Sequence, residues 1–136
     1  MNIIDLELYK WQMHRLSSKP GDWLEYGAFI SILPRQSGKT EMLIRMAKIL
    51  QKENEDFLFV VSKKIYKDNI LKRFQIDPKK IEVLMTSTLI FNFKTIEKSN
   101  KINLLIDEFM TLEKIALQSL LKMDWKSVSM VGGFRL

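Results

Sequence analysis

The chain has 136 residues, of which 46% are hydrophobic, and this is enough for one folded domain with a substantial core. It contains no cysteine and a single histidine, His14, which excludes disulfides and thiolate metal sites and leaves no basis for a catalytic triad or a histidine-rich metal site. Its formal net charge of +6 favours a polyanionic partner, and no apolar run approaches the roughly 18 residues of a membrane span.

The first 22 residues have the pattern of a helix followed by a loop. Ile4, Leu8 and Trp11 recur at helical spacing, which predicts a helix over residues 3–16. Residues 17–22 include Pro20 and Gly21 and have the composition of a loop. We expect this N-terminal unit (residues 1–22) and a sheet core (residues 23–136) to form a single domain.

A motif typical of phosphate binding follows the first predicted strand. Residues 27–33 are an apolar run that suits a buried strand, and residues 41–52 are strong helix formers. The segment at their junction matches G-x-x-x-x-G-K-[ST] except at its first position, and it reads Leu33-Pro34-Arg35-Gln36-Ser37-Gly38-Lys39-Thr40. In such a loop, Gly38 lets backbone N–H groups approach phosphate oxygens, Lys39 reaches the β- and γ-phosphates, and the Thr40 hydroxyl ligates Mg²⁺. We therefore expect ATP and Mg²⁺ as cofactors, although the sequence leaves GTP open.

A basic stretch follows the second predicted strand, which covers residues 56–62. Residues 63–80 contain seven basic side chains and only two acidic ones, around a helix predicted over residues 65–74. Such an excess is typical of a surface that binds a polyanion, so Lys63, Lys64 and Lys67 are candidate nucleic-acid contacts. A solvated lysine-rich face is an equally open interpretation. A third strand is predicted over residues 81–86, and a short helix or turn over residues 87–93.

The fourth predicted strand, residues 102–108, ends in two neighbouring carboxylates. Asp107 is the candidate ligand of Mg²⁺ opposite Thr40, and Glu108 the candidate base that orients and deprotonates the attacking water. Successive strand residues point to opposite faces, so a division of roles is expected. The alternative is that both carboxylates cap the next helix, which is predicted over residues 109–122.

The alternation of strands and helices predicts an α/β fold with a mostly parallel five-stranded sheet and helices on both faces. The fifth strand is predicted over residues 127–132. Ligands of such sheets bind beyond the carboxyl ends of the strands. The phosphate-binding motif, Lys63 and Asp107 each follow a strand, so we expect them at one edge of the sheet.

The motif at residues 34–40 and the acidic strand ending at Asp107 and Glu108 resemble those of the ATPase domain of viral large terminases. These are P-loop NTPases of the additional-strand type, related to superfamily 2 helicases, that package DNA into phage heads. The resemblance implies a RecA-like core in which ATP hydrolysis powers DNA packaging. It also implies that Arg35 acts on the γ-phosphate or in coupling, and that Gln12 contacts adenine. A structural ion pair for Arg35 and a plain exposed helix position for Gln12 stay open.

The resemblance also implies partners and a location. Double-stranded DNA, self-association into a ring and other viral packaging proteins are the expected partners, in the cytoplasm of a host cell. No membrane partner, signal peptide or nuclease domain is expected, and Arg135 is a second candidate arginine finger. Two alternative functions remain: a nucleotide-binding module that assembles with a partner ATPase or capsid protein, and a truncated helicase-like ATPase that acts on RNA or single strands.

Overall fold

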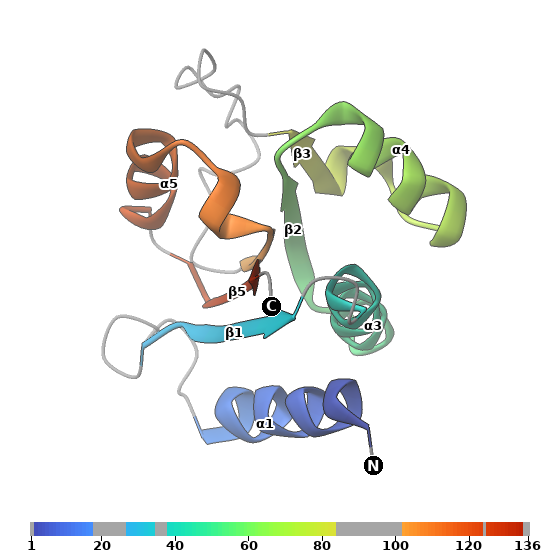
Figure 1. Cartoon of the computed structure of the whole chain (residues 1–136). Coiled ribbons are helices and arrows are strands. Elements are labelled where there is room, and N and C mark those ends of the chain that lie inside the picture. Colours follow the sequence, from blue (N-terminus) through green and yellow to red (C-terminus); the bar gives the residue numbers. More distant parts are fainter. Residues whose placement is uncertain (1, 18–26, 35–37, 84–101, 124, 135–136) are drawn as a thin grey trace.

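Helices and strands alternate along the chain as the sequence predicts (Figure 1). The computed structural model describes residues 2–17, 27–34, 38–83, 102–123 and 125–134. The elements within these ranges are α1 (Ile3–Ser17), β1 (Phe29–Pro34), α3 (Lys39–Lys52), β2 (Asp56–Val61), α4 (Lys64–Arg73), η1 (Pro78–Lys80), β3 (Ile81–Val83), β4 (Ile102–Asp107), η3 (Phe109–Thr111), α5 (Lys114–Leu121) and β5 (Ser127–Phe134). The helix or turn expected over residues 87–93 lies outside the described residues.

The five strands form one sheet in the order β1-β5-β4-β2-β3, and every described pairing is parallel. β5 therefore lies between β1 and β4, with Leu33 beside Gly133 and Asp107 beside Val131. Since all strands run in one direction, their carboxyl ends meet at one edge of the sheet. The predicted fold class is confirmed: the protein is α/β and consistent with a RecA-like fold.

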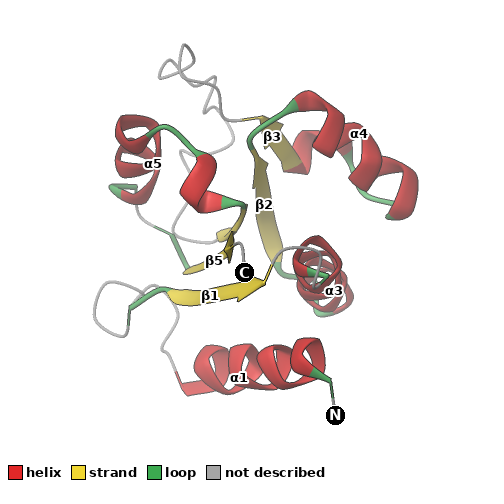
Figure 2. Ribbon diagram, in the orientation of Figure 1, coloured by secondary structure: helices red, strands yellow, loops and turns green. Residues whose placement is uncertain are grey.

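Helices cover both faces of the sheet, because the buried strands are apolar on both sides. One face of the sheet packs against α1, α3 and α4, and the other against α5 (Figure 2). In β4, Leu105 points to the α3 face while Leu104 and Ile106 point to the α5 face, and all three are fully buried. Burial of each such side chain stabilises the fold by about 1.5–3 kcal/mol, so β4 is fixed firmly in the middle of the sheet.

Hydrogen bonds to the sheet hold α1 in one orientation. The indole Nε1 of the buried Trp11 donates to Ser129 Oγ at 2.9 Å, and Ser31 Oγ donates to Glu7 Oε2 at 2.8 Å. Ile4, near the start of α1, lies next to Gly38 at the carboxyl edge of the sheet. Trp11 is two turns further along, at the level where β1 and β5 begin, because Ser129 pairs with Phe29. α1 therefore runs antiparallel to β1.

The prediction of a single helix over residues 109–122 is wrong. The structure has two shorter helices there, the 3₁₀ helix η3 and the α-helix α5. The backbone of Leu112 is extended, with φ −74° and ψ 148°, and this interrupts the helix. Glu113 then starts α5 by accepting the backbone N–H of Ala116 on its side chain at 3.2 Å. The break leaves η3 as a short helical turn that begins at the residue after Glu108.

Candidate functional site

The conformation of Gly38 at the carboxyl end of β1 sets the start of α3. Gly38 has a φ of +92°, in the left-handed region that residues with a side chain rarely adopt, so glycine is required there. The N–H of Met42 donates to its carbonyl at 2.9 Å and closes the first helical turn. Because Gly38 offers no side-chain acceptor, the polarised N-terminus of α3 is available to an anion.

The two predicted carboxylates occupy the carboxyl end of the central strand β4. Asp107 is its last residue and is 4% exposed. Glu108 has a φ of +51°, so the chain turns sharply after the strand. Neither carboxylate is used as a helix cap: Glu108 makes no side-chain cap hydrogen bond to η3, and Asp107 is bonded to Thr40. The capping interpretation therefore receives no support.

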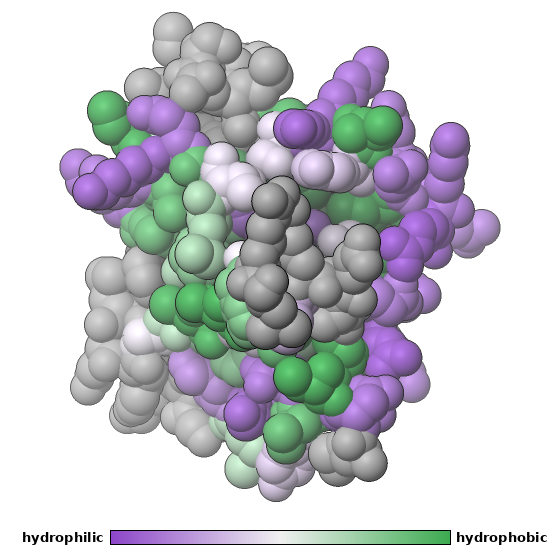
Figure 3. All heavy atoms as spheres, in the orientation of Figure 1, coloured by the Kyte–Doolittle hydropathy of each residue, from purple (hydrophilic) through white to green (hydrophobic). Residues whose placement is uncertain are grey.

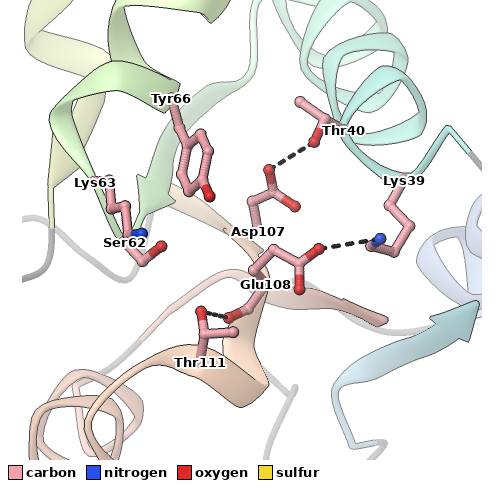
Figure 4. Close-up of a pocket in the computed structure, with 8 residues that line it drawn as sticks. All are labelled: Lys39, Thr40, Ser62, Lys63, Tyr66, Asp107, Glu108 and Thr111. Atoms are coloured by element: carbon pink, nitrogen blue, oxygen red, sulfur yellow. Dashed lines mark hydrogen bonds and ion pairs between the residues drawn. The ribbon is translucent and has the colours of Figure 1, made fainter. Parts of the chain in front are cut away.

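The phosphate-binding motif and the acidic strand meet through two polar contacts (Figure 4). Thr40 Oγ1 donates to Asp107 Oδ2 at 2.9 Å. Lys39 Nζ lies 3.0 Å from Glu108 Oε1, and its side chain is largely buried. Sixty-seven positions separate Thr40 from Asp107, so only the sheet topology brings these four side chains together.

Burial of the Asp107 side chain disfavours the charged form of its carboxyl group. Burial raises the pKa of its carboxyl group from 3.8 to about 6. The hydrogen bond from Thr40 opposes this rise, the negative charge of Glu108 adds to it, and the positive charge of Lys39 opposes it. The backbone N–H of Glu108 also helps to lower the pKa of Asp107. Among the described residues, however, no hydrogen bond of normal geometry reaches the other carboxylate oxygen, the buried Oδ1, which is unusual because buried polar atoms are nearly always paired.

The donor set around Asp107 fits Mg²⁺ bound together with a phosphate group. Thr40 supplies a hydroxyl and Asp107 a carboxylate with an unpaired oxygen, and Mg²⁺ prefers oxygen ligands of these kinds. The described residues contain no group of three or more histidine, cysteine, aspartate or glutamate side chains that could hold a metal ion. Mg²⁺ commonly binds through one or two carboxylates and the phosphates of its substrate.

A cavity of about 560 Å³ opens over this cluster, a volume within the range of small-molecule sites. Its lining residues are Lys39, Thr40, Ser62, Lys63, Tyr66, Asp107, Glu108 and Thr111. Ser62 and Lys63 follow β2 at the predicted edge of the sheet, whereas Tyr66 and Thr111 were not predicted. The signal for both was helical spacing, because Tyr66 lies three residues after Lys63 and Thr111 three after Glu108.

The three candidate nucleic-acid lysines lie at the start of α4, where Lys63 is the N-cap residue. The side of the molecule that carries α4 is largely hydrophilic (Figure 3). Lys63 lines the cavity, and its Nζ lies 6.0 Å from the centre of the Tyr66 ring. Lys64 is exposed and Lys67 is half-buried, and neither lines the cavity. The structure therefore brings one of the three to the cavity and leaves the other two beside it.

The structure does not bring Gln12 to the cavity. Gln12 accepts a hydrogen bond from Arg15 at 3.0 Å, and it follows Trp11 in the half of α1 that lies where the strands begin. That level lies toward the opposite edge of the sheet from Lys39, so adenine contact by Gln12 receives no support. Pro34 is the last residue of β1 and pairs with Phe134. The remaining candidates lie outside the described residues, namely Arg35, Gln36, Ser37 and Arg135.

No protein-family model, curated protein or solved structure matches this chain. None of the helices within the described ranges has the length and apolar character that crossing a membrane requires.

Proposed function

We propose that this protein binds ATP with Mg²⁺ and hydrolyses it at the cavity between α3 and the carboxyl end of β4. The observation that supports this most is the pair of contacts from Thr40 to Asp107 and from Lys39 to Glu108. A cation, a hydroxyl and two carboxylates of unequal burial converge beside an uncapped helix N-terminus. These are the groups that phosphoryl transfer from a nucleoside triphosphate requires.

Lys39 and Glu108 divide the work of binding and proton transfer. With the nucleotide bound, Lys39 donates to the terminal phosphate oxygens, and the N–H groups at the start of α3 bind the same anion. Lys39 must then exchange its contact with Glu108 for the phosphate, which frees the Glu108 carboxylate. Glu108, whose side chain is 30% exposed, accepts the proton of the attacking water. Such general-base catalysis contributes about 10²- to 10⁴-fold in rate.

Thr40 and Asp107 are the residues that would hold Mg²⁺. When bound there, the ion neutralises negative charge on the phosphates and on the leaving group. Its charge would offset the cost of burying the Asp107 carboxylate, whose Oδ1 has no hydrogen-bond partner among the described residues. The Thr40 hydroxyl, which donates to Asp107 in the free protein, would supply a second oxygen ligand.

We further propose that hydrolysis drives movement along double-stranded DNA, as in a terminase-like packaging motor. Two features support this. The strand β5 separates β1 from β4, which is the order expected of an additional-strand ATPase, and basic side chains gather next to the cavity at Lys63, Lys64 and Lys67. Arg35 and Arg135 are the candidates for an arginine finger that neighbouring subunits of a ring would supply.

Replacing one lysine tests the nucleotide site, and the chain offers a matched control. Lys39→Ala removes a charge-assisted contact to phosphate, so the affinity for ATP should fall about 10- to 100-fold. Lys126 also pairs with a glutamate, Glu55, at 2.6 Å, but at the other end of β4. Lys126→Ala should leave ATP affinity within about threefold of the wild type. Equal ATP affinity of Lys39→Ala and the wild type, in titrations with a fluorescent ATP analogue, contradicts the proposal.

Turnover with different nucleic acids separates the motor from its alternatives. Mg²⁺-dependent phosphate release that double-stranded DNA stimulates supports the packaging motor. Stimulation by single strands or RNA favours the helicase-like ATPase. Tight ATP binding without release, with or without any nucleic acid, favours the nucleotide-binding interaction module.

A further inference from the structure

Two consecutive glycines lie in an interior strand, where glycine is normally unfavourable. Gly132 and Gly133 belong to β5 and pair with Ile32 and Leu33 of β1. A glycine inside a strand costs about 0.5–1 kcal/mol relative to alanine. Neither has the positive φ that marks Gly27 and Gly38, so backbone conformation does not require glycine at these positions. The reason must lie in what surrounds them.

Gly133 leaves room for the side chain of Lys39. It points to the same face of the sheet as Val131, the face that α3 covers. A Cβ added to Gly133 would lie 2.7 Å from Lys39 Nζ and 2.9 Å from Lys39 Cε, closer than such atoms approach in proteins. Lys39 therefore reaches Glu108 by passing directly over the bare backbone of β5.

Gly132 leaves room for side chains of η3 on the opposite face of the sheet. A Cβ there would lie 2.9 Å from Met110 Sδ and 2.9 Å from Phe109 Cε1, both in η3. η3 begins at the residue after Glu108, so its distance from β5 sets where the Glu108 backbone leaves the sheet. The close packing of η3 onto β5 thus depends on the missing side chain.

We propose that Gly133 and Gly132 are positioning residues, Gly133 for Lys39 and Gly132 for Glu108. This inference deepens the proposed function and rests on it. β5 separates the motif strand β1 from the acidic strand β4. A side chain at position 133 would meet Lys39, and one at position 132 would meet Phe109 and Met110, which follow Glu108. The glycine pair lets them close to the 3.0 Å between Lys39 Nζ and Glu108 Oε1.

Replacing each glycine by alanine should have a different kinetic effect. Gly133→Ala displaces the Lys39 ammonium group, so the Kd for a fluorescent ATP analogue should rise about 10-fold or more, with kcat at saturating ATP changed less than about threefold. Gly132→Ala displaces η3 and with it Glu108, so kcat should fall about 10- to 100-fold while the Kd stays within about threefold. The Kd and kcat of both variants, measured beside the wild type, give this split.

Gly27→Ala is the control for a general loss of stability. Its φ of +81° strains an alanine, but no atom of the described residues lies within 4 Å of the added methyl group. It should lower the melting temperature without changing Kd or kcat. Gly133→Ala, in contrast, meets the end of a flexible side chain, so its melting temperature should stay close to that of the wild type.

A readout without nucleotide separates this inference from the proposed function. In protein carrying ¹⁵N-labelled lysine, the Nζ signal of Lys39, assigned by its loss in Lys39→Ala, should shift in Gly133→Ala and not in Gly27→Ala. That shift in a protein that neither binds nor hydrolyses ATP supports the positioning role and contradicts only the ATPase. An unshifted signal, or ATP kinetics of both glycine variants equal to the wild type, overturns the positioning role.

Discussion

β4 ends in a polar cluster at each edge of the sheet, and each cluster contains a lysine paired with a glutamate. At the amino end, Lys126 Nζ lies 2.6 Å from Glu55 Oε1. The buried Asn103 donates to Glu55 Oε2 at 3.1 Å and to the Asp56 carbonyl at 2.9 Å, and it accepts from Ser127 Oγ at 2.6 Å. Each of these polar side chains is used in a hydrogen bond, so the cluster ties β4 to β2 and β5.

At the carboxyl end the corresponding groups are not all used. Lys39 contacts Glu108, and Thr40 donates to Asp107, but the second carboxylate oxygen of Asp107 is buried without a hydrogen-bond partner in the part of the chain that the structure describes. A buried polar atom left unpaired costs about 1–3 kcal/mol. The same strand therefore carries a cluster that stabilises the fold at one end and a cluster that opposes it at the other.

The pKa shifts of the two clusters have opposite signs, in line with this difference in hydrogen bonding. Burial tends to raise the pKa of Glu55, but hydrogen bonds from Lys126 and Asn103 and the charges of Lys126 and Arg15 outweigh it, so its pKa lies below 4.5. Burial dominates at Asp107, whose pKa rises to about 6. Strongly perturbed groups of the second kind, placed in a cleft, are typical of functional sites.

Removing the negative charge of the glutamate at each end should give the largest contrast. Glu108→Gln should reduce ATP turnover about 10²- to 10⁴-fold, because the amide cannot accept the proton of the attacking water. ATP binding should persist, since Lys39 and Thr40 remain. The turnover of Glu55→Gln should stay within about twofold of the wild-type value. Its free energy of unfolding should be lower than that of the wild type, because Lys126 loses its charged partner. Phosphate release and urea denaturation of both variants are the measurements.

Turnover of Glu108→Gln at the wild-type rate would remove Glu108 as the base. Loss of turnover in Glu55→Gln at an unchanged free energy of unfolding would contradict the separation of the two clusters.

The sequence predicted the carboxyl-end cluster because its members belong to two local patterns. Gly38, Lys39 and Thr40 follow an apolar run and open a helix, and Asp107 and Glu108 end another apolar run. In a parallel sheet these two positions fall at the same edge whatever the exact strand order. Local periodicity and one topological rule were therefore sufficient to predict that these two segments meet, and they contribute four of the eight residues that line the cavity.

What the sequence did not predict depends on packing between distant segments. The Trp11–Ser129 hydrogen bond joins residues 118 positions apart, and it fixes α1 in the direction that moves Gln12 away from the cavity. The fit of Gly133 under Lys39 has the same origin, since no local pattern shows which side chain will cross a strand. The break at Leu112 was missed because residues 109–122 are good helix formers on propensity alone.

The next largest expected difference between the two clusters is in how the stability of the protein depends on pH. The folded pKa of Asp107, about 6, lies above its unfolded value of 3.8, so the folded state binds the proton more tightly. The stability of the ligand-free protein should therefore fall by about 2 kcal/mol as pH rises from 4 to 6. Glu55 acts in the opposite direction, because its pKa is lowered: its contribution is present above pH 4.5 and is lost as pH falls further.

Urea denaturation between pH 4 and 7 in EDTA measures this dependence. Asp107→Asn should abolish the fall between pH 4 and 6, and Glu55→Gln should leave it in place. A wild-type stability that rises with pH across this window would show that Asp107 is not the dominant buried carboxylate.

The smallest expected effects come from one hydroxyl at each end of β4. Thr40→Val removes the donor to Asp107, and Ser127→Ala removes the donor to Asn103. Each should lower the free energy of unfolding by roughly 1–2 kcal/mol, because each leaves one buried oxygen with fewer partners. Only Thr40→Val should also lower ATP turnover and raise the Mg²⁺ concentration that turnover requires, and Thr40→Ser should restore both.

This last pair separates function from stability most cleanly, because the losses of stability are matched. A large effect on turnover could otherwise be attributed to partial unfolding, whereas two variants of equal stability and unequal turnover cannot. Equal Mg²⁺ dependence of Thr40→Val and Ser127→Ala would mean that the unpaired oxygen of Asp107 is a feature of packing and not a ligand for a metal ion.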